Sequence, residues 1–203
     1  FCNALNYIKI NHLVYISSDA VYKDSKKLLN EKSIAQPDSL HGLMHYSREQ
    51  MLKNSFNGHL CIVRPTLIYG MKDPHNGYGP NMFIRNAIKN KNINIYGMGE
   101  ELRDHIHIDD VANLISKIIL YKSIGYLNLA SGKIFSFLYI AKKIIKYANS
   151  ESKIIQIKRT SPMPHGGYRA FDTKNIKKLF PKTTLLSINK GLSKIFSIKF
   201  KEY

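Results

Sequence analysis

The chain has 203 residues, of which 44% are hydrophobic and 22% charged, which lies within the range of one globular domain. Its formal charge of +17 comes from dispersed lysines and arginines, and no helix-turn-helix, zinc-finger or RNA-recognition signature accompanies it. We therefore expect an anionic substrate together with compositional bias, and no nucleic-acid partner. No apolar run approaches the ~20 residues that cross a bilayer, so we expect no membrane partner. Cys2 and Cys61 have neither disulfide-framework nor zinc-knuckle spacing, and we expect both to be reduced and buried in a cytoplasmic protein.

The first part of the chain is expected to contain two strands and a helix. Residues 1–8 have the pattern of the end of a helix, and the apolar, β-branched run at 13–17 predicts a buried strand. A helix-start signal at 36–39 precedes apolar residues at helical spacing over 40–54, which predicts a helix there. A second apolar strand is expected at 60–65.

Strands and helices continue to alternate in the rest of the chain, and this alternation argues for an α/β fold with a parallel sheet. The expected elements are, in order, a Gly/Pro/Asn loop (71–81), a helix from Pro80 or Asn81, a strand (93–96), an amphipathic helix capped by Asp109 and Asp110, a strand (126–131), a helix capped by Ser136, a strand (154–158), a Pro/Gly loop (162–168) and one or two small helices.

Five segments combine polar residues with glycines in a fixed order: 17–22, 41–49, 64–70, 96–111 and 126–132. The most specific are RPxxxYG, then GxGxxxRDxxHxDD, then NLASG. In this order the segments resemble the extended short-chain dehydrogenase/reductase family, specifically its NAD-dependent epimerase/dehydratase group, which acts on nucleotide sugars.

The resemblance implies a Rossmann-like parallel sheet, present only in its carboxy-terminal part, and a smaller α/β substrate-binding domain. Residues 1–70 and the strand at 126–131 would belong to the NAD-binding domain, and residues 71–125 and 132–203 mainly to the substrate-binding region. The sequence has no GxxGxxG turn, which in such folds holds the pyrophosphate. We therefore expect a fragment that binds NAD or NADP only within the complete protein, as a homodimer.

The same resemblance implies the catalytic residues. Ser18 would hydrogen-bond the sugar hydroxyl. The family then uses a tyrosine and a lysine one helical turn apart, and here His41 and His45 occupy those positions. Histidine can itself transfer protons near neutral pH, so altered catalysis, lost catalysis and a misplaced alignment all stay open.

Further residues are expected around the cofactor and the substrate. The resemblance places Ser17, His45 and Pro65 beside the cofactor. Guanidinium groups pair well with a diphosphate, which suggests Arg103 and, more weakly, Arg159; the alternative for Arg103 is a structural ion pair with Asp104 or Asp109. The remaining candidates at the substrate are Asn81, Tyr69 and the loop residues His75, Tyr78, His165 and Tyr168.

Other functions are compatible with parts of the pattern. Asp19 matches an aspartate of the 4,6-dehydratase group, but Ala20 stands where that group has glutamate, which favours an epimerase or a reductase. The HxxxH spacing of His41 and His45 suits zinc, but Gly42 replaces the glutamate of HExxH, and we expect no metal. The main alternative is a non-catalytic scaffold of the same fold that binds a nucleotide sugar or a protein.

Overall fold

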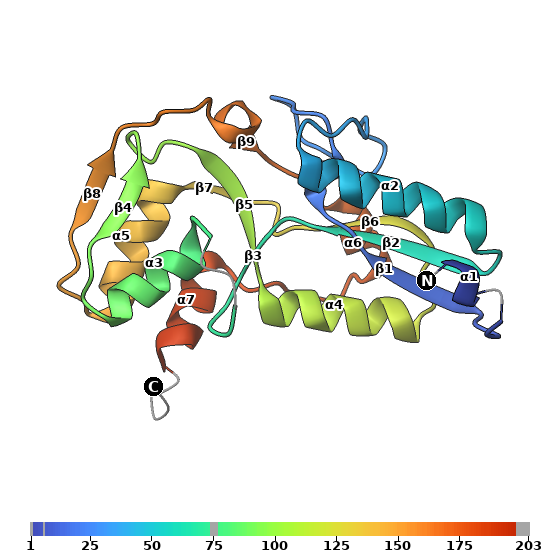
Figure 1. Cartoon of the computed structure of the whole chain (residues 1–203). Coiled ribbons are helices and arrows are strands. Elements are labelled where there is room, and N and C mark those ends of the chain that lie inside the picture. The colour runs from blue at the N-terminus through green and yellow to red at the C-terminus, as the bar shows by residue number, and fades with distance from the viewer. Residues whose placement is uncertain (1, 6, 74–76, 198–203) are drawn as a thin grey trace.

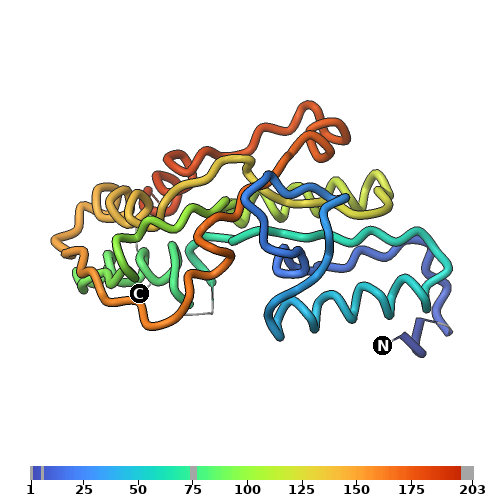
Figure 2. The backbone as a smooth tube through the Cα atoms, turned by 90° about the horizontal axis from the view of Figure 1, so that it is seen from above, coloured from blue at the N-terminus to red at the C-terminus, as the bar shows by residue number. Residues whose placement is uncertain are grey.

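The structure, a computed structural model, describes residues 2–5, 7–73 and 77–197. The molecule is elongated and has two parts joined by extended segments of chain (Figure 1). The view from above keeps the two parts next to each other along the same long axis (Figure 2). His75, one of the expected loop contacts, lies outside the described residues.

A three-stranded parallel sheet forms the centre of the first part. It contains β1 (His12–Ile16), β2 (His59–Pro65) and β6 (Gly125–Leu129), in the order β1-β2-β6. Ile16 is paired with Val63, and Pro65 with Leu129, so the carboxyl ends of the strands lie together. The three strands expected from apolar runs are confirmed, as is the parallel sheet.

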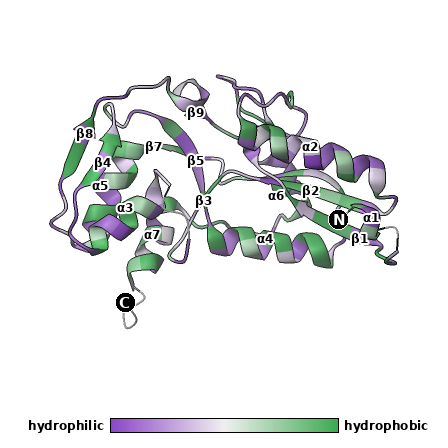
Figure 3. Ribbon diagram, viewed as in Figure 1, coloured by the Kyte–Doolittle hydropathy of each residue, from purple (hydrophilic) through white to green (hydrophobic). Residues whose placement is uncertain are grey.

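Helices cover both faces of this sheet, with α2 (Leu40–Ser55) on one side and α4 (Ile108–Leu120) on the other (Figure 1). Hydrophobic and hydrophilic residues alternate along α4 (Figure 3), and its buried residues pack against the strands. The cap of α4 differs from the expectation. His107 is the N-cap, its Nδ1 accepting from the Asp109 amide at 3.1 Å, while Asp109 and Asp110 occupy the first turn.

The helix α2 was correctly predicted by its apolar spacing, but its buried face was not. Its buried residues are Gly42, Glu49 and Leu52. The apolar residues that predicted the helix remain exposed, with exposed fractions of 74% for Leu40, 50% for Leu43, 46% for Met44 and 56% for Met51. The spacing therefore revealed a helix whose apolar stripe faces away from the sheet.

The two parts are connected by β3 (Leu67–Tyr69) and β5 (Leu102–His107), which pair in parallel. Through Leu102 and Arg103, β5 also pairs with β7 (Ile134–Ser136) in antiparallel orientation on one edge and with β9 (Tyr168–Arg169) in parallel orientation on the other. These four strands were not predicted. The β5 segment is largely polar, and its side chains are nonetheless buried, so neither of the usual apolar strand patterns is present.

The second part contains a parallel pair, β4 (Ile93–Tyr96) with β8 (Ile154–Ile157), both at their expected positions. Its core is formed by apolar residues of three helices, α3 (Pro80–Ile88), α5 (Phe137–Ala148) and α7 (Ile188–Ser197). Ser136 caps α5 as expected, accepting from the Tyr139 amide.

Two further short helices lie beside the three-stranded sheet: α1 (Cys2–Leu5), which contacts α2, and α6 (Lys174–Leu179), which contacts β6. Both α4 and α6 fall in ranges expected to belong mainly to the substrate-binding region, yet their apolar residues pack with the sheet. The division of the chain near residue 70 stays a prediction. Both cysteines are free; Cys61 is buried as expected, but Cys2 is only half-buried.

Candidate functional site

A buried ion pair connects β2 to α2, and Ser17 at the end of β1 joins it. The Ser17 hydroxyl donates to Glu49 Oε1 at 2.5 Å, and Arg64 of β2 donates to both Glu49 oxygens, at 2.9 and 2.5 Å. The Arg64 guanidinium also stacks on the rings of Tyr22 and Tyr126, at 4.7 and 4.4 Å from their centroids. The Ser17 hydroxyl is therefore committed to Glu49, and the Ser17 amide donates to the Val63 carbonyl oxygen at 2.7 Å.

Ser18 begins the short 3-10 turn η1 (Asp19–Val21), and its Oγ accepts from the Ala20 amide at 3.1 Å. The first turn of α2 lies directly against this turn. A Cβ on Gly42 would overlap the carbonyl oxygen of Ala20 and would lie 2.8 Å from its carbonyl carbon. Glycine at position 42 therefore brings the start of α2, with His41, close to the turn that carries Ser18.

His41 and His45 lie one above the other on α2, with ring centroids 4.7 Å apart in an edge-to-face arrangement. The Tyr15 hydroxyl is 3.3 Å from His45 Nδ1. Burial lowers the pKa of His45, and the nearby His41 and Arg48 lower it further, against the opposing effect of Glu49. His45 is thus neutral at neutral pH and does not provide the positive charge of a lysine.

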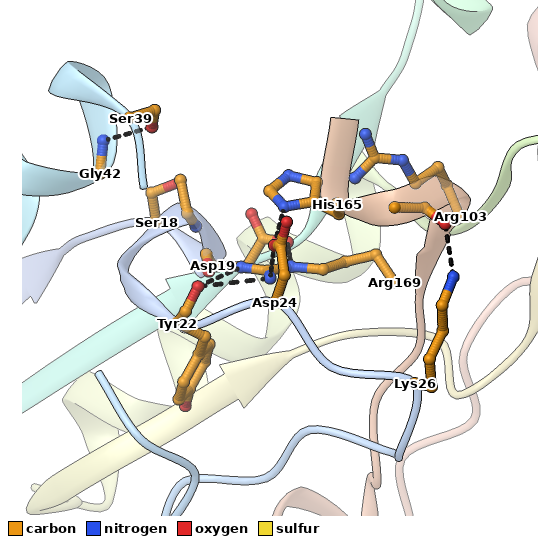
Figure 4. Close-up of polar contacts among 12 residues, drawn as sticks. Ser18, Asp19, Tyr22, Asp24, Lys26, Ser39, Gly42, Arg103, His165 and Arg169 are labelled. Atoms are coloured by element: carbon orange, nitrogen blue, oxygen red, sulfur yellow. Dashed lines mark hydrogen bonds and ion pairs between the residues drawn. The ribbon is translucent and has the colours of Figure 1, made fainter. Parts of the chain in front are cut away.

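The turn that carries Ser18 is held from the far end of the chain by Arg169, which is 1% exposed. Its Nε donates to Asp19 Oδ2 at 3.3 Å and its Nη1 to Asp24 Oδ1 at 3.1 Å (Figure 4). The same guanidinium donates to the carbonyl oxygens of Asp19 and Tyr22. Arg169 was not predicted as a site residue.

His165, an expected sugar contact, lies on the loop before β9 and pairs with Asp24 at 2.5 Å (Figure 4). On the same loop, the Gly166 carbonyl accepts from Lys26 Nζ at 2.5 Å. Burial lowers the pKa of His165, and Arg169 and Arg103 add to this effect. These contacts close the 162–167 loop onto residues 24–26.

Arg103 and Arg159 converge on a cleft of about 340 Å³. Arg103 comes from β5, and Arg159 follows β8. Both pair with the buried Glu101, Arg103 at 2.8 Å and Arg159 at 3.0 Å. The ion-pair partner of Arg103 is thus Glu101, and the expectation of Asp104 or Asp109 was wrong. The lining residues are Leu67, Tyr78, Tyr96, Glu101, Arg103, Phe137, Arg159, Ser161 and Pro164.

Aromatic rings form much of the cleft wall. The centroid of the Tyr78 ring lies 4.9 Å from those of both Tyr96 and Phe137, and the Arg159 guanidinium lies 5.6 Å from the centroid of Tyr96. The Tyr78 hydroxyl accepts from the Tyr96 amide at 3.2 Å. Cationic groups beside aromatic faces suit a ligand that combines phosphate with a flat ring.

Three other candidates lie away from this wall. Tyr69 is 1% exposed, packs edge-on against His107 at 5.2 Å and belongs to the core of the second part; burial raises its pKa, and a contact with the substrate stays a prediction. Asn81 holds its own loop, accepting from the Gly70 amide at 3.0 Å and donating to Asp73 at 2.8 Å. Pro65 is buried at the end of β2.

The RD and ASG segments meet at Asp104, which the sequence had suggested only as an alternative ion-pair partner of Arg103. Its Oδ1 accepts from the amide and hydroxyl of Ser131, at 2.8 and 2.7 Å, and its Oδ2 from the Gly132 amide at 2.8 Å. Burial raises the Asp104 pKa to about 6, although these hydrogen bonds oppose the rise. Asp104 fixes β5, and with it Arg103, to the loop after β6.

The residues expected beside a dinucleotide lie near the carboxyl ends of β1 and β2. Ser17 follows β1, Pro65 ends β2, and His45 of α2 lies next to Tyr15 of β1. The other end of such a cofactor needs a glycine-rich turn, which the sequence lacks.

Within residues 2–5, 7–73 and 77–197, no three His, Cys, Asp or Glu side chains gather as a metal site. Over the same residues, no helix combines the length and apolar character needed to cross a membrane.

Comparisons with known proteins agree with this arrangement. A dTDP-D-glucose 4,6-dehydratase of Dictyostelium discoideum is 30% identical over 156 residues, covering 69% of this chain and 36% of the relative. A putative UDP-glucose 4-epimerase of Methanocaldococcus jannaschii is 31% identical over 131 residues, covering 61% of this chain and 43% of the relative. The chain therefore spans less than half the length of these two relatives.

Solved structures share the fold. The UDP-glucuronic acid 4-epimerase of Bacillus cereus, in complex with UDP-glucuronic acid and NAD, has a TM-score of 0.85 at 21% identity, with 97% of this chain and 63% of that one covered. A dTDP-glucose 4,6-dehydratase of Bacillus anthracis in complex with NAD has a TM-score of 0.77 at 18% identity. The match covers 92% of this chain and 60% of that one. The sequence model of the NAD-dependent epimerase/dehydratase family matches residues 1–127, and the chain belongs to this family.

Proposed function

We propose that the chain is the substrate-binding side of an NAD(P)-dependent epimerase or reductase that acts on a nucleotide sugar. The observation that carries the proposal is the convergence of Arg103 and Arg159 on one aromatic-walled cleft. The two arginines lie on separate strands or strand ends and share one carboxylate, Glu101. Two arginines and one glutamate leave a net charge of +1 beside the cavity, which suits the diphosphate of a nucleotide sugar.

The roles of the other residues complete the proposal. Ser18 orients a sugar hydroxyl, and the pair His41/His45 transfers its proton, while NAD, when bound, supplies the hydride acceptor. His45 stays neutral because burial lowers its pKa, so it can accept a proton but cannot replace a lysine cation. One structural neighbour with this fold holds UDP-glucuronic acid and NAD together, which supports the combination of ligands.

The exposed apolar residues of α2 support a homodimer in the complete protein. Four of them, Leu40, Leu43, Met44 and Met51, are exposed on the helix surface away from the sheet, and a group of exposed apolar side chains of this kind is typical of an interface. A cytoplasmic location also belongs to the proposal, supported by two free cysteines.

The experiment that tests the proposal is calorimetric titration of the protein with UDP. Arg103→Ala and Arg159→Ala should each weaken binding by roughly tenfold or more, since a charge-assisted hydrogen bond contributes about 1.5–3 kcal/mol. Lys142→Ala, on the exposed face of α5, is the matched loss of one positive charge and should change little. Equal losses in all three variants would instead indicate diffuse attraction of polyanions.

A non-catalytic scaffold is the second candidate, and the neutral His45 favours it because the lysine charge is then missing from the α2 helix. Such a protein would bind UDP through the same arginines. Binding without turnover of UDP-glucose or UDP-glucuronic acid by the complete protein would decide for the scaffold.

A further inference from the structure

Of the described residues that line the arginine cleft, Glu101 alone is acidic. It stands immediately before β5, and its side chain is 3% exposed. An acid in this position is unexpected beside an anion-binding site, because it competes with the ligand for the same donors. The inference below concerns this carboxylate and rests on the proposed function of the cleft.

The two oxygens of Glu101 serve different arginines. Oε1 accepts from Arg103 Nε at 3.1 Å and from its Nη2 at 2.8 Å. Oε2 accepts from Arg159 Nη2 at 3.0 Å. Because the carboxylate is the bridge between the two guanidinium groups, it fixes their separation as well as offsetting one of their charges.

Two guanidinium groups against one carboxylate leave one positive charge uncompensated beside the cleft. Among the described residues, Arg159 Nε is buried without a hydrogen-bond partner, so the Arg159 guanidinium is only partly paired, and a buried donor without an acceptor is costly. An anionic ligand beside the exposed part of this guanidinium would offset the remaining charge.

We propose that Glu101 is an affinity- and specificity-determining residue of the cleft, acting as a built-in competitor of the ligand's phosphate groups. It holds Arg103 and Arg159 apart and occupies the donors that a small anion would use. A single phosphate therefore finds few free donors, whereas a nucleoside diphosphate can reach the remaining donors and the aromatic wall at once. Glu101 restrains binding so that simple anions do not block the site.

The test is the affinity of the purified protein for UDP and for inorganic pyrophosphate, measured by calorimetry at low and high salt. Glu101→Gln keeps the size of the side chain and removes its charge. We expect UDP binding to tighten roughly tenfold at low salt, because an opposing charge at contact distance is removed, and pyrophosphate binding to tighten more. The gain should shrink at high salt.

Glu100→Gln is the matched control, since it removes one negative charge from the adjacent, exposed residue that lies outside the lining of the cleft. It should leave both affinities nearly unchanged. An equal gain in Glu100→Gln and Glu101→Gln would overturn the inference in favour of general charge. If Glu101→Gln is unfolded, Glu101→Asp, too short to bridge both arginines, should give a smaller gain, and no gain in this folded variant also overturns it.

The arginine variants separate this inference from the proposed function. If Arg103→Ala and Arg159→Ala lose UDP binding while Glu101→Gln shows no gain, the inference fails and the proposed function stands. If neither the unaltered protein nor Glu101→Gln binds UDP, both fail. Binding of UDP by Glu101→Gln alone would support the competitor role and refute nucleotide binding by the native cleft.

Discussion

Gly42 in the first turn of α2 lies against the backbone of Ala20, and no larger side chain fits between them. A Cβ would overlap the Ala20 carbonyl oxygen and come within 2.9 Å of Pro37 Cβ. Because the obstacle is backbone rather than a flexible side chain, α2 itself has to move to relieve the overlap. The position of His41 relative to Ser18 thus depends on the absence of one methyl group.

Gly42→Ala should destabilise the fold although alanine favours helices. The gain in helix propensity is about 1 kcal/mol, while overpacking of a tight contact costs about 1–3 kcal/mol and displaces the helix. We expect a net lowering of the free energy of unfolding, measured by urea denaturation. Ser47→Ala, at an exposed position of the same helix, is the control. An unchanged or raised stability of Gly42→Ala would refute the close contact.

Glu49→Gln should lower the free energy of unfolding more than a charge-removing substitution at the surface does. It leaves the buried Arg64 without its paired carboxylate, and breaking a buried ion pair by removing one partner costs about 3–5 kcal/mol. Glu151→Gln, which removes the same charge from an exposed residue, should alter the free energy of unfolding by less than about 0.5 kcal/mol. Similar losses in the two variants would mean that the Glu49–Arg64 pair contributes nothing specific.

His105 should make the protein sensitive to mild acid. Burial lowers the His105 pKa to about 3, below its ordinary value, so the unfolded chain takes up a proton first as the pH falls below about 6.5. Its contribution to stability is complete above that pH and decreases toward pH 3. Between pH 7 and 5.5 we expect the free energy of unfolding of the parent to fall by about 1 kcal/mol relative to that of His105→Gln.

This comparison removes the opposite effect of Asp104, whose pKa is raised to about 6. Its folded state binds the extra proton between its ordinary pKa and about 6, so lowering the pH through this window stabilises the fold. Both effects are present in the parent, and only that of His105 disappears in the variant. His59→Gln, at an exposed histidine of β2, is the control. Parallel pH profiles for the parent and His105→Gln would contradict a buried neutral imidazole.

The histidine pair is tested in the complete protein, with turnover of UDP-glucose and UDP-glucuronic acid as the measurement. If the pair transfers the proton, activity should be lost in acid, where His45 takes up a proton despite its lowered pKa and can no longer accept one, and His41→Ala should abolish activity. The two protonations belong to the pair because the rings are 4.7 Å apart.

The double variant His41→Tyr/His45→Lys separates the remaining alternatives. An inert parent whose double variant gains turnover would mean that catalysis has been lost from this helix. Full activity of His41→Ala would mean that neither histidine acts on the substrate. Retained UDP binding in every variant is the control for folding.

The sequence predicted the elements whose signals are local. Apolar runs indicated β1, β2 and β6, and the spacing of Val111, Leu114 and Ile118 indicated α4. It did not predict β5, because Arg103 and Asp104 are buried there only by virtue of Glu101, Ser131 and Gly132. Satisfied buried charges have no periodic signature.

In the candidate site, too, the sequence predicted the residues that have a local signal. Arg103 and Arg159 stood out through motif order and chemistry, whereas Tyr69, equally part of a motif, turned out to be core. Arg169 offered no local signal, since Asp19 lies 150 residues before it and Asp24 lies 145 residues before it. A contact over such a separation can be seen only once the strands are in place.

The position of Arg169 in the chain also determines when the site can be completed during synthesis. The turn with Ser18 leaves the ribosome before its anchor, because the guanidinium that holds Asp19 and the Tyr22 carbonyl is synthesised 150 residues after Asp19. Domains generally begin to fold while the chain is still being made, so this turn lacks its anchor until those residues have been added. The strand β1 can pair with β2 earlier, but the site at its end is completed only when β9 joins β5.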